Sequence, residues 1–426
     1  MLNQKISFIL FVLLLVSSLS AHANSTERQL TNLTLDQAIE KALKSNFELS
    51  VLELEADKAK ARTFQVSRLP NPELSVEVEN FGGSGELRQS DAIETTVMIS
   101  QPFLLGGKRS KQKKVSLLEE KLTNWDLRSQ RLEIIKEVHK TFVDVLGAQE
   151  LVKLNRELVN LEKEVFRSVK ERVKAGKVSP IEEIKAKANL DAEMIVLERA
   201  ERSLVSAKKR LCALWGDSLT YFNEVSADIT ALKDLPDYDE ILLKAIKNPD
   251  LARWSTEMEK RKMSLNLEKA RRLPDVEIGV GWRDFNESDD HAFLAGITIP
   301  LPLFNRNKGA VREALHDMSQ AEKEKASSEL SVQTELWGAY NEIKAAYSEA
   351  SALKNTVLPG MKKVLEAQQE GYRRGKFDYI EVLDAQRSFF ESRRNLLDSL
   401  VSYHKGIAEI KRLIGAAKIQ DIFINN

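Results

Sequence analysis

The feature that most constrains this chain is a sequence pattern that runs through it twice. Four segments of the first half resemble four segments of the second half, and both sets follow the same order. The pairs are 35–49 with 238–251, 68–79 with 272–283, 99–109 with 297–308, and 172–190 with 372–389. The offset is roughly 200 residues in each pair, far longer than the repeats of solenoid proteins. The sequence therefore predicts an internal duplication, with a first structural repeat at 24–225 and a second at 226–426.

Each half contains two short segments in which apolar and polar residues alternate. In the first segment, Leu74, Val76 and Val78 occupy one side and polar residues the other. Polar, turn-like residues separate the two segments of each half, as β-hairpins require. The sequence predicts hairpins at 72–103 and 275–303, each following a helix that a Leu-Pro pair ends. The strands are long enough to cross a bilayer at a tilt, although a soluble sheet over a core shows the same alternation.

The segments after the hairpins are typical of very long helices. From Lys108 to Lys174 there is no proline, and Gly147 is the only interior glycine, which permits roughly 100 Å of helix. Apolar residues recur there at spacings of three and four, the pattern of a coiled-coil seam. They are Leu151, Leu154, Leu158, Leu161, Val165 and Val169. A glycine then breaks the helix in each half and a return helix follows, so long helix pairs are predicted at 107–215 and 307–415.

The charge and cysteine content exclude several classes of protein. The chain has 64 basic and 64 acidic residues, so it carries no overall positive charge for binding nucleic acid. Charged residues make up 30% of the chain, which suits long helices with solvent-exposed faces. The single cysteine, Cys212, allows neither an intrachain disulfide nor a cysteine-based metal site, and its apolar neighbours indicate a small core residue.

The segment 1–23 resembles a secretory signal peptide. Lys5 supplies the positive region, a short apolar core follows, and Ala-His-Ala at 21–23 is a typical cleavage site. An uncleaved anchor is the alternative, but the apolar core is too short to span a bilayer comfortably. No later apolar run reaches spanning length. This leaves either a soluble exported protein or one that crosses a membrane as β-strands.

The predicted strands are too few for one chain to span a membrane alone. Unpaired N–H and C=O groups at an open sheet edge cost several kcal/mol each in hydrocarbon, and small closed barrels need about eight strands or more. If the strands lie in lipid, several copies of the chain must therefore share one barrel. The long helices, related by the same symmetry, would then form a second cylinder, and the assembly would be a conduit.

The chain resembles the TolC family of outer-membrane efflux ducts over essentially the whole mature sequence. The most specific similarity lies in the two helix breaks, Gly176 through Glu182 and Gly375 through Asp384, where a glycine is followed six residues later by an acidic residue. Within the family, the segments at 69–83 and 101–109 are most similar to the heavy-metal-efflux branch, the CzcC-type proteins.

The resemblance implies a fold that is mainly α with a small β part. Each chain would supply long antiparallel coiled-coil helices to a periplasmic α-barrel, and four transmembrane β-strands to a shared 12-stranded β-barrel of a homotrimer. The implied location is the bacterial outer membrane, in contact with outer-membrane lipid and extending into the periplasm. The implied partners are a periplasmic adaptor and an inner-membrane pump of the resistance-nodulation-division (RND) type. The implied function is an exit duct for divalent heavy-metal cations, with no enzymatic activity, cofactor or nucleic-acid partner.

The resemblance also assigns a periplasmic gate to the second helix break. Glu381 and Asp384 match the family's acidic constriction, and Tyr372 matches a tyrosine that helps to hold the gate closed. Three copies of the two acids on a three-fold axis would attract cations and repel anions, and crowding would raise some of their pKa values. The alternative is an ordinary helix start, where acidic residues favour the N-terminal dipole.

This chain departs from the family at one gate position. Where the family has a basic residue two positions after the glycine, this sequence has Phe377, and a substitute would have to come from Arg373, Arg374 or Lys376. The resemblance further implies that the adaptor contacts the turns at the helix breaks. The residues expected in that contact are Gly176, Lys177, Glu182, Gly375 and Lys376.

Two other functions stay open from the sequence. A drug-efflux or type I secretion duct would have the same fold, and a periplasmic coiled-coil adaptor or scaffold would use small soluble sheets. An enzyme is not indicated, because the sequence has no catalytic constellation. A tight metal site is not indicated either, because the 5 histidines are scattered without ligand spacing.

Overall fold

The computed structural model describes residues 30–88, 92–220, 222–416 and 422, so the predicted signal segment lies outside the described residues. The chain is mainly helical and divides into two compact units. The first unit takes its described residues from Met1–Lys41, Thr141–Ala231 and Leu353–Val401. The second takes them from Ala42–Lys140, Leu232–Ala352 and Ser402–Asn426.

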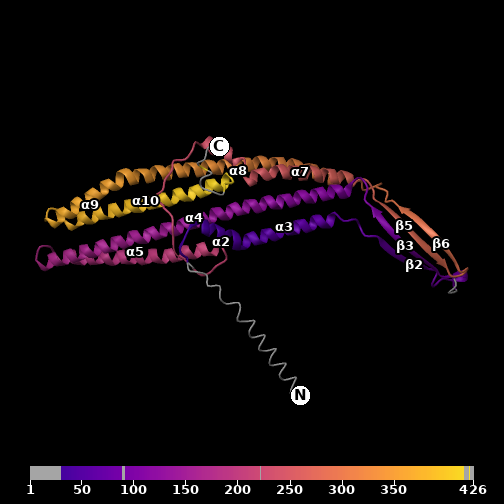
Figure 1. Cartoon of the computed structure of the whole chain (residues 1–426), viewed down its shortest axis with the longest axis horizontal. Coiled ribbons are helices and arrows are strands. Elements are labelled where there is room, and N and C mark those ends of the chain that lie inside the picture. The colour runs from indigo at the N-terminus through magenta and orange to yellow at the C-terminus, as the bar shows by residue number, and fades with distance from the viewer. Residues whose placement is uncertain (1–29, 89–91, 221, 417–421, 423–426) are drawn as a thin grey trace, which may run out of the picture. The chain divides into compact units, whose positions relative to one another are not determined.

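The elements follow a similar order twice along the chain (Figure 1). The first series is β1 (Leu30–Leu33), α2 (Leu35–Ser45), α3 (Phe47–Val66), β2 (Glu73–Glu79), η1 (Gly85–Arg88), β3 (Glu94–Phe103), α4 (Lys108–Lys174) and α5 (Pro180–Ala213). The second is β4 (Phe222–Val225), α6 (Tyr238–Ala245), α7 (Pro249–Ala270), β5 (Val276–Phe285), β6 (Asp290–Thr298), α8 (Lys308–Ala352), the π-helical turn η3 (Leu353–Val357), α9 (Leu358–Arg373) and α10 (Tyr379–Leu413). Among the helices of the described residues, none is both long and apolar enough to cross a membrane.

The helices before the strands begin at side chains that cap them. Asn46 precedes α3, and its side-chain oxygen accepts from the N–H of Leu49 at 3.1 Å. Asn248 precedes α7 and accepts in the same way from Asp250 at 2.9 Å, with Pro249 in the first turn. Such caps satisfy N–H groups that have no partner inside the helix.

The four central strands form one antiparallel sheet in the order β2-β3-β5-β6. The two predicted hairpins are therefore not isolated from each other, because β3 pairs with β5 along its whole length. Strands β2 and β6 are the outer strands, and neither pairs on its outer side with any strand of the described residues. Within the described part of the chain, this sheet is therefore open at both edges.

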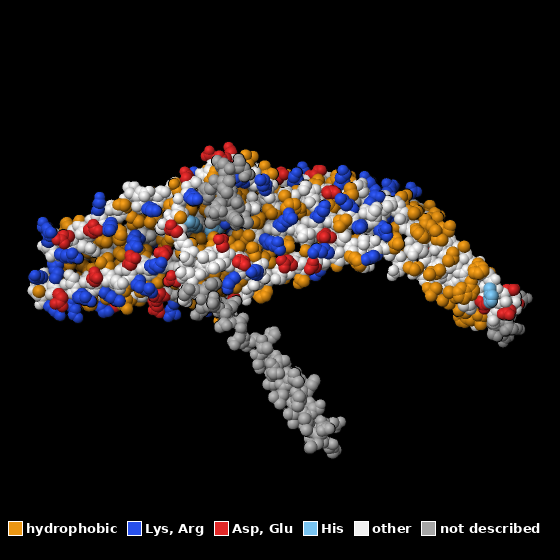
Figure 2. Space-filling model, in the orientation of Figure 1, with side chains coloured by type: hydrophobic (Ala, Val, Ile, Leu, Met, Phe, Trp, Pro, Cys, Tyr) orange, Lys and Arg blue, Asp and Glu red, His pale blue; other side chains and the backbone are white. Residues whose placement is uncertain are grey.

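One face of the sheet is an exposed apolar surface. The register aligns Val76, Val97, Trp282 and Phe293 in one row across the four strands. Val76 is 63% exposed and Phe293 is 97% exposed, and hydrophobic side chains gather over these strands in Figure 2. The predicted alternation is confirmed here, although no core among the described residues covers the apolar side.

The other side of the sheet holds a cluster of charged groups centred on Arg283. Its guanidinium lies 3.1 Å from a carboxylate oxygen of Glu79 and 3.0 Å from one of Glu94. Its Nε donates to the hydroxyl of Thr96 at 2.8 Å. The sheet is therefore polar on one side and apolar on the other.

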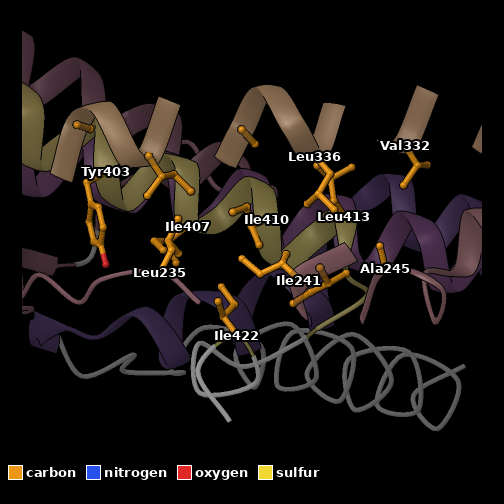
Figure 3. Packing of buried hydrophobic residues seen from close by; sticks show 14 residues of the cluster. Leu235, Ile241, Ala245, Val332, Leu336, Tyr403, Ile407, Ile410, Leu413 and Ile422 are labelled. Carbon is orange, nitrogen blue, oxygen red and sulfur yellow. The ribbon is translucent and has the colours of Figure 1, made fainter. Parts of the chain in front are cut away.

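A buried cluster in the second unit packs α6, α8 and α10 together (Figure 3). Ile241 of α6, Leu336 of α8 and Ile410 of α10 are fully buried in it. The hydroxyl of Tyr403 fixes a loop to this cluster, because it donates to the main-chain oxygen of Lys233 at 2.6 Å. Burial of this kind, rather than helix propensity, supplies most of the stability of long helices.

The first unit contains a short parallel pairing and the predicted coiled-coil seam. Strand β1 pairs with β4, and the side chain of Gln149 bonds both main-chain groups of Val225, at 2.8 Å and 3.1 Å. The seam on α4 is confirmed, because Leu154 and Leu158 pack with Phe390 of α10. No local pattern in the sequence predicted β1 and β4.

Candidate functional site

The two helix breaks in the first unit have the same backbone structure. Gly176 and Gly375 both have positive φ, 68° and 74°. In each turn the N–H of the next residue donates to the carbonyl five positions before it, which is the Schellman C-cap. The two bonds join Lys177 to Arg172 at 2.9 Å and Lys376 to Gly371 at 2.8 Å. Glycine is favoured at the centre because it adopts positive φ without steric cost.

The helices that leave these turns begin in two different ways. Ser179 caps α5, its hydroxyl accepting from Ile181 at 3.3 Å, and Pro180 occupies the first turn. At the start of α10, the carboxylate of Glu381 accepts from the N–H of Asp378 at 2.9 Å. This is the backward bond of a capping box. The helix-start interpretation of Glu381 therefore has direct geometric support, whatever further role the residue has.

Glu381 and Asp384 lie together on one exposed side of α10. Their spacing of three residues places them on the same side of the helix. The residues between them, Val382 and Leu383, point the other way and are buried in the cluster at the two turns. The structure thus brings the two predicted gate carboxylates to one surface of the chain and leaves both accessible.

Tyr372, the third predicted gate residue, is 7% exposed and packs inside the chain. The guanidinium of Arg172 lies 4.2 Å from the centre of its ring, within the range of a cation–π interaction. The ring of Tyr379 lies 6.1 Å away. Tyr372 of α9 and Tyr379 of α10 share a cluster with Val169 of α4 and Ala186 of α5, so four helices meet there.

Burial controls the protonation of the tyrosines in this cluster. It raises the pKa of Tyr372, an effect that Arg172 opposes and the nearby Glu182 carboxylate reinforces. Burial also raises the pKa of Tyr379 to about 12. Both phenols therefore stay neutral at physiological pH. Glu182, predicted at the adaptor contact, is half-buried and lies beside Tyr372.

Phe377 occupies the position at which the resemblance implies a basic residue, and its ring packs against Gly371. A Cβ on Gly371 would lie 2.1 Å from the Phe377 ring, so only glycine fits beneath it. Of the three basic residues proposed as substitutes, two are engaged with Glu370. Arg374 bonds that carboxylate at 2.7 Å and Arg373 lies 3.8 Å from it. Lys376 is exposed, as are Lys177 and both turn glycines.

Sequence reasoning missed two residues of this cluster, Arg172 and Tyr379. Arg172 joins the two turns, since its Nη1 donates to the main-chain oxygen of Tyr372 at 2.8 Å. A basic residue in the last turn of a helix is common for electrostatic reasons alone, so its position gave no signal of this contact. Tyr379 stands four residues after the second turn glycine, where an aromatic residue is ordinary.

The described residues contain no group of three or more His, Cys, Asp or Glu side chains arranged to hold a metal ion. Cys212 is 1% exposed and packs in the interior. The candidate site is therefore a pair of turns with an accessible acidic surface and a buried aromatic cluster behind it.

Comparison with known proteins assigns the chain to a family. Residues 38–217 and 243–416 match the family described as "Outer membrane efflux protein". The cobalt-zinc-cadmium resistance protein CzcC of Cupriavidus metallidurans is 33% identical over 384 residues, 90% of each chain. The nickel-cobalt-cadmium resistance protein NccC of Alcaligenes xylosoxydans xylosoxydans is 27% identical over 63% of this chain and 59% of its own. The outer-membrane channel OprN has the same fold, with a TM-score of 0.77, 19% identity and 90% coverage of both chains.

The family match covers most of both halves, and the CzcC relationship extends over nearly the whole chain. The family is one of efflux channels rather than enzymes. This chain belongs to the outer membrane efflux protein family.

Proposed function

We propose that this chain is the outer-membrane exit duct of a tripartite efflux system that exports divalent heavy-metal cations. Family membership supports the duct. The metal substrate is supported by two relatives, whose names record resistance to cobalt, zinc and cadmium in one case and to nickel, cobalt and cadmium in the other. The chain itself would be passive, and an inner-membrane RND pump would supply the energy and the selection of the substrate.

The observation that carries this proposal is the sheet. Its apolar row is exposed, and both outer strands lack a partner among the described residues. In hydrocarbon an open edge is costly because no water replaces the missing hydrogen bonds. Three chains that pool four strands each would pair every edge and turn the apolar row toward lipid. A homotrimer with a shared twelve-stranded barrel is therefore the assembly that we propose.

The acidic surface of α10 supports a cation-selective constriction. Glu381 and Asp384 are exposed in the single chain and lie next to a turn. Around a three-fold axis, their copies would form a ring of carboxylates that favours cations. The buried Tyr372 would act behind this ring by holding the two turns together.

The exposed turns support a docking surface for a periplasmic adaptor. Gly176, Lys177, Gly375 and Lys376 are all accessible, and each turn has the same Schellman backbone. Glu182 would contribute less, because it is half-buried against Tyr372. The repeated order of elements supports the proposed duplication, in which each half supplies one such turn.

Deleting the gene tests the function and its substrate. The mutant should become sensitive to zinc, cobalt, cadmium or nickel, and the wild-type gene should restore tolerance. Hydrophobic drugs serve as the comparison, because a drug duct has the same fold. Unchanged metal tolerance combined with lost drug tolerance would reject the metal substrate and keep the duct.

Cell fractionation tests the duct itself. The mature protein should appear in detergent-extracted outer membranes as a trimer on native gels. Recovery as a periplasmic monomer would instead support a soluble scaffold.

A further inference from the structure

A carboxyl group and a side-chain amide meet in the interior of the first unit. Glu162 of α4 is 4% exposed and Gln386 of α10 is 1% exposed. The Nε2 of Gln386 donates to the Oε1 of Glu162 at 2.8 Å. The remaining oxygens, Oε2 of Glu162 and Oε1 of Gln386, are both buried and have no hydrogen-bond partner. Because both atoms are acceptors while Glu162 is ionised, they cannot bond each other.

Protonation of Glu162 would give both unpartnered oxygens a hydrogen bond. A protonated carboxyl carries an O–H donor and keeps an acceptor oxygen, and a primary amide likewise has a donor and an acceptor. The two groups can therefore close a ring of two hydrogen bonds, in which Gln386 donates to Oε1 of Glu162 and Oε2 of Glu162 donates to Gln386. Buried polar groups are nearly always paired, so the unpartnered oxygens indicate where the proton resides.

The surrounding charges act on this proton in opposing directions. Burial raises the pKa of Glu162 to about 7, and the carboxylate of Glu193 on α5 adds to the effect. The amide of Gln386 and the guanidinium of Arg387, both on α10, favour the ionised form. Tyr379, also on α10, senses the same charge, because ionised Glu162 helps to raise its pKa.

We propose that Glu162 and Gln386 form a proton-dependent link between α4 and α10, fastened when the carboxyl is protonated and weakened when it ionises. The link lies two residues beyond Asp384 on α10, directly behind the acidic surface. The link itself depends only on Glu162 and Gln386. Its effect on the opening of the duct rests in addition on the gate that we propose above.

The pH dependence has a defined sign. The folded-state pKa of about 7 lies above the ordinary value of 4.5. The folded protein therefore retains a proton that the unfolded chain has lost. The stability that this proton contributes is fully present below about pH 4.5 and is lost as the pH rises through about 7.

Infrared spectroscopy of the full mature protein in detergent tests the link directly. Wild type at about pH 6 should show the carbonyl stretch of a protonated carboxyl, and this band should disappear by about pH 8. Glu162→Gln should lack the band. Glu193→Gln should shift its loss to lower pH, because a neighbouring negative charge has been removed. Absence of the band in wild type, or its persistence in Glu162→Gln, would overturn the proposal.

Thermal unfolding provides a second readout. Glu162→Gln places two amides side by side, which form the same ring of two bonds without a titrating proton. Between about pH 5 and about pH 8, the melting temperature of wild type should fall by about 2–4 °C more than that of Glu162→Gln. Gln386→Leu should weaken the link at every pH, whereas Glu164→Gln, at an exposed position two residues away, should behave as wild type.

If Glu162→Gln kept the wild-type pH dependence, the proton-dependent link would be wrong. That result would leave the proposed duct untouched, because neither measurement involves transport. Conversely, failure of the metal-tolerance or fractionation tests would leave the link standing as a property of the fold.

Discussion

The guanidinium of Arg172 covers the ring of Tyr372 at 4.2 Å and donates to the main-chain oxygen of the same residue at 2.8 Å. These two contacts connect the last turn of α4 to the last turn of α9. Each helix ends in a Schellman turn at this point. One side chain therefore couples the two turns that the sequence identifies separately.

Replacing Arg172 should loosen the pair of turns. Arg172→Ala removes the stacked cation and the hydrogen bond, together worth about 1–3 kcal/mol. If the turns close the duct, single-channel conductance in planar bilayers should rise. Arg167→Ala is the matched control on the same helix, since that residue is exposed. Equal conductance in Arg172→Ala and wild type would show that the contact does not restrain the gate.

Replacing Glu381 and replacing Asp384 should both lower cation selectivity but should affect stability to different extents. Both Glu381→Gln and Asp384→Asn should reduce selectivity for cations in bilayer recordings, because each removes one carboxylate per chain. Only Glu381 also caps α10, and loss of a helix cap typically costs about 0.5–2 kcal/mol. A glutamine keeps an acceptor oxygen for this bond, so Glu381→Ala is the variant that should lower thermal stability more than Asp384→Ala. Unchanged ion selectivity in the double variant would remove the gate role from both residues.

Gly406 of α10 should not tolerate a methyl group. A Cβ at this position would lie 2.3 Å from Cγ1 of Ile343 on α8, and overpacking of a tight helix contact costs about 1–3 kcal/mol. Gly406→Ala should lower the melting temperature, and it should lower it less when introduced into an Ile343→Ala background, where the clashing side chain is absent. Gly338→Ala is the control on α8, where a Cβ meets no heavy atom within 4 Å. A Gly406→Ala protein as stable as wild type would contradict the close approach.

His139 should make the fold sensitive to acid. The residue is 3% exposed, and burial, with Lys411 and His404 nearby, lowers its pKa from 6.5 to about 3. In this pH range His139 is protonated in the unfolded chain but not in the folded chain, so stability falls as the pH drops below about 6.5. The expected loss is about 2 kcal/mol between about pH 7 and about pH 5.

The variant His139→Leu isolates this effect. It should lose less stability than wild type over that pH range, whereas His316→Leu, at an exposed position, should follow wild type. Comparing each variant with wild type also separates His139 from Glu162, whose contribution has the opposite sign. Identical acid sensitivity in His139→Leu and wild type would show that folding does not lower the pKa of His139.

The long-range plan of the fold follows from local patterns in the sequence. The alternation through Val76 predicted a two-sided strand, and the spacing of Leu154 and Leu158 predicted the seam that packs on α10. Gly176 and Gly375 marked the turns because positive φ favours glycine. Each of these signals is carried by residues a few positions apart.

What the sequence did not show depends on distant partners. The pairing of β1 with β4 joins segments nearly 200 residues apart, and the side chain of Gln149 bonds the main chain of β4 at Val225. The π-helical turn η3 interrupts an otherwise regular helix in the second half. The contact of Glu162 with Gln386 looks like two ordinary polar helix residues until α4 and α10 are placed together.

The central claim is that the apolar side of the sheet lies in lipid. Phe293 and the adjacent Ala292 on β6 point to opposite sides of the sheet, and native Cys212 is buried, which keeps background labelling low. A water-soluble thiol reagent applied to intact outer membranes should label Ala292→Cys many times faster than Phe293→Cys. Rapid labelling of Phe293→Cys, at a rate equal to that of Ala292→Cys, would contradict the account.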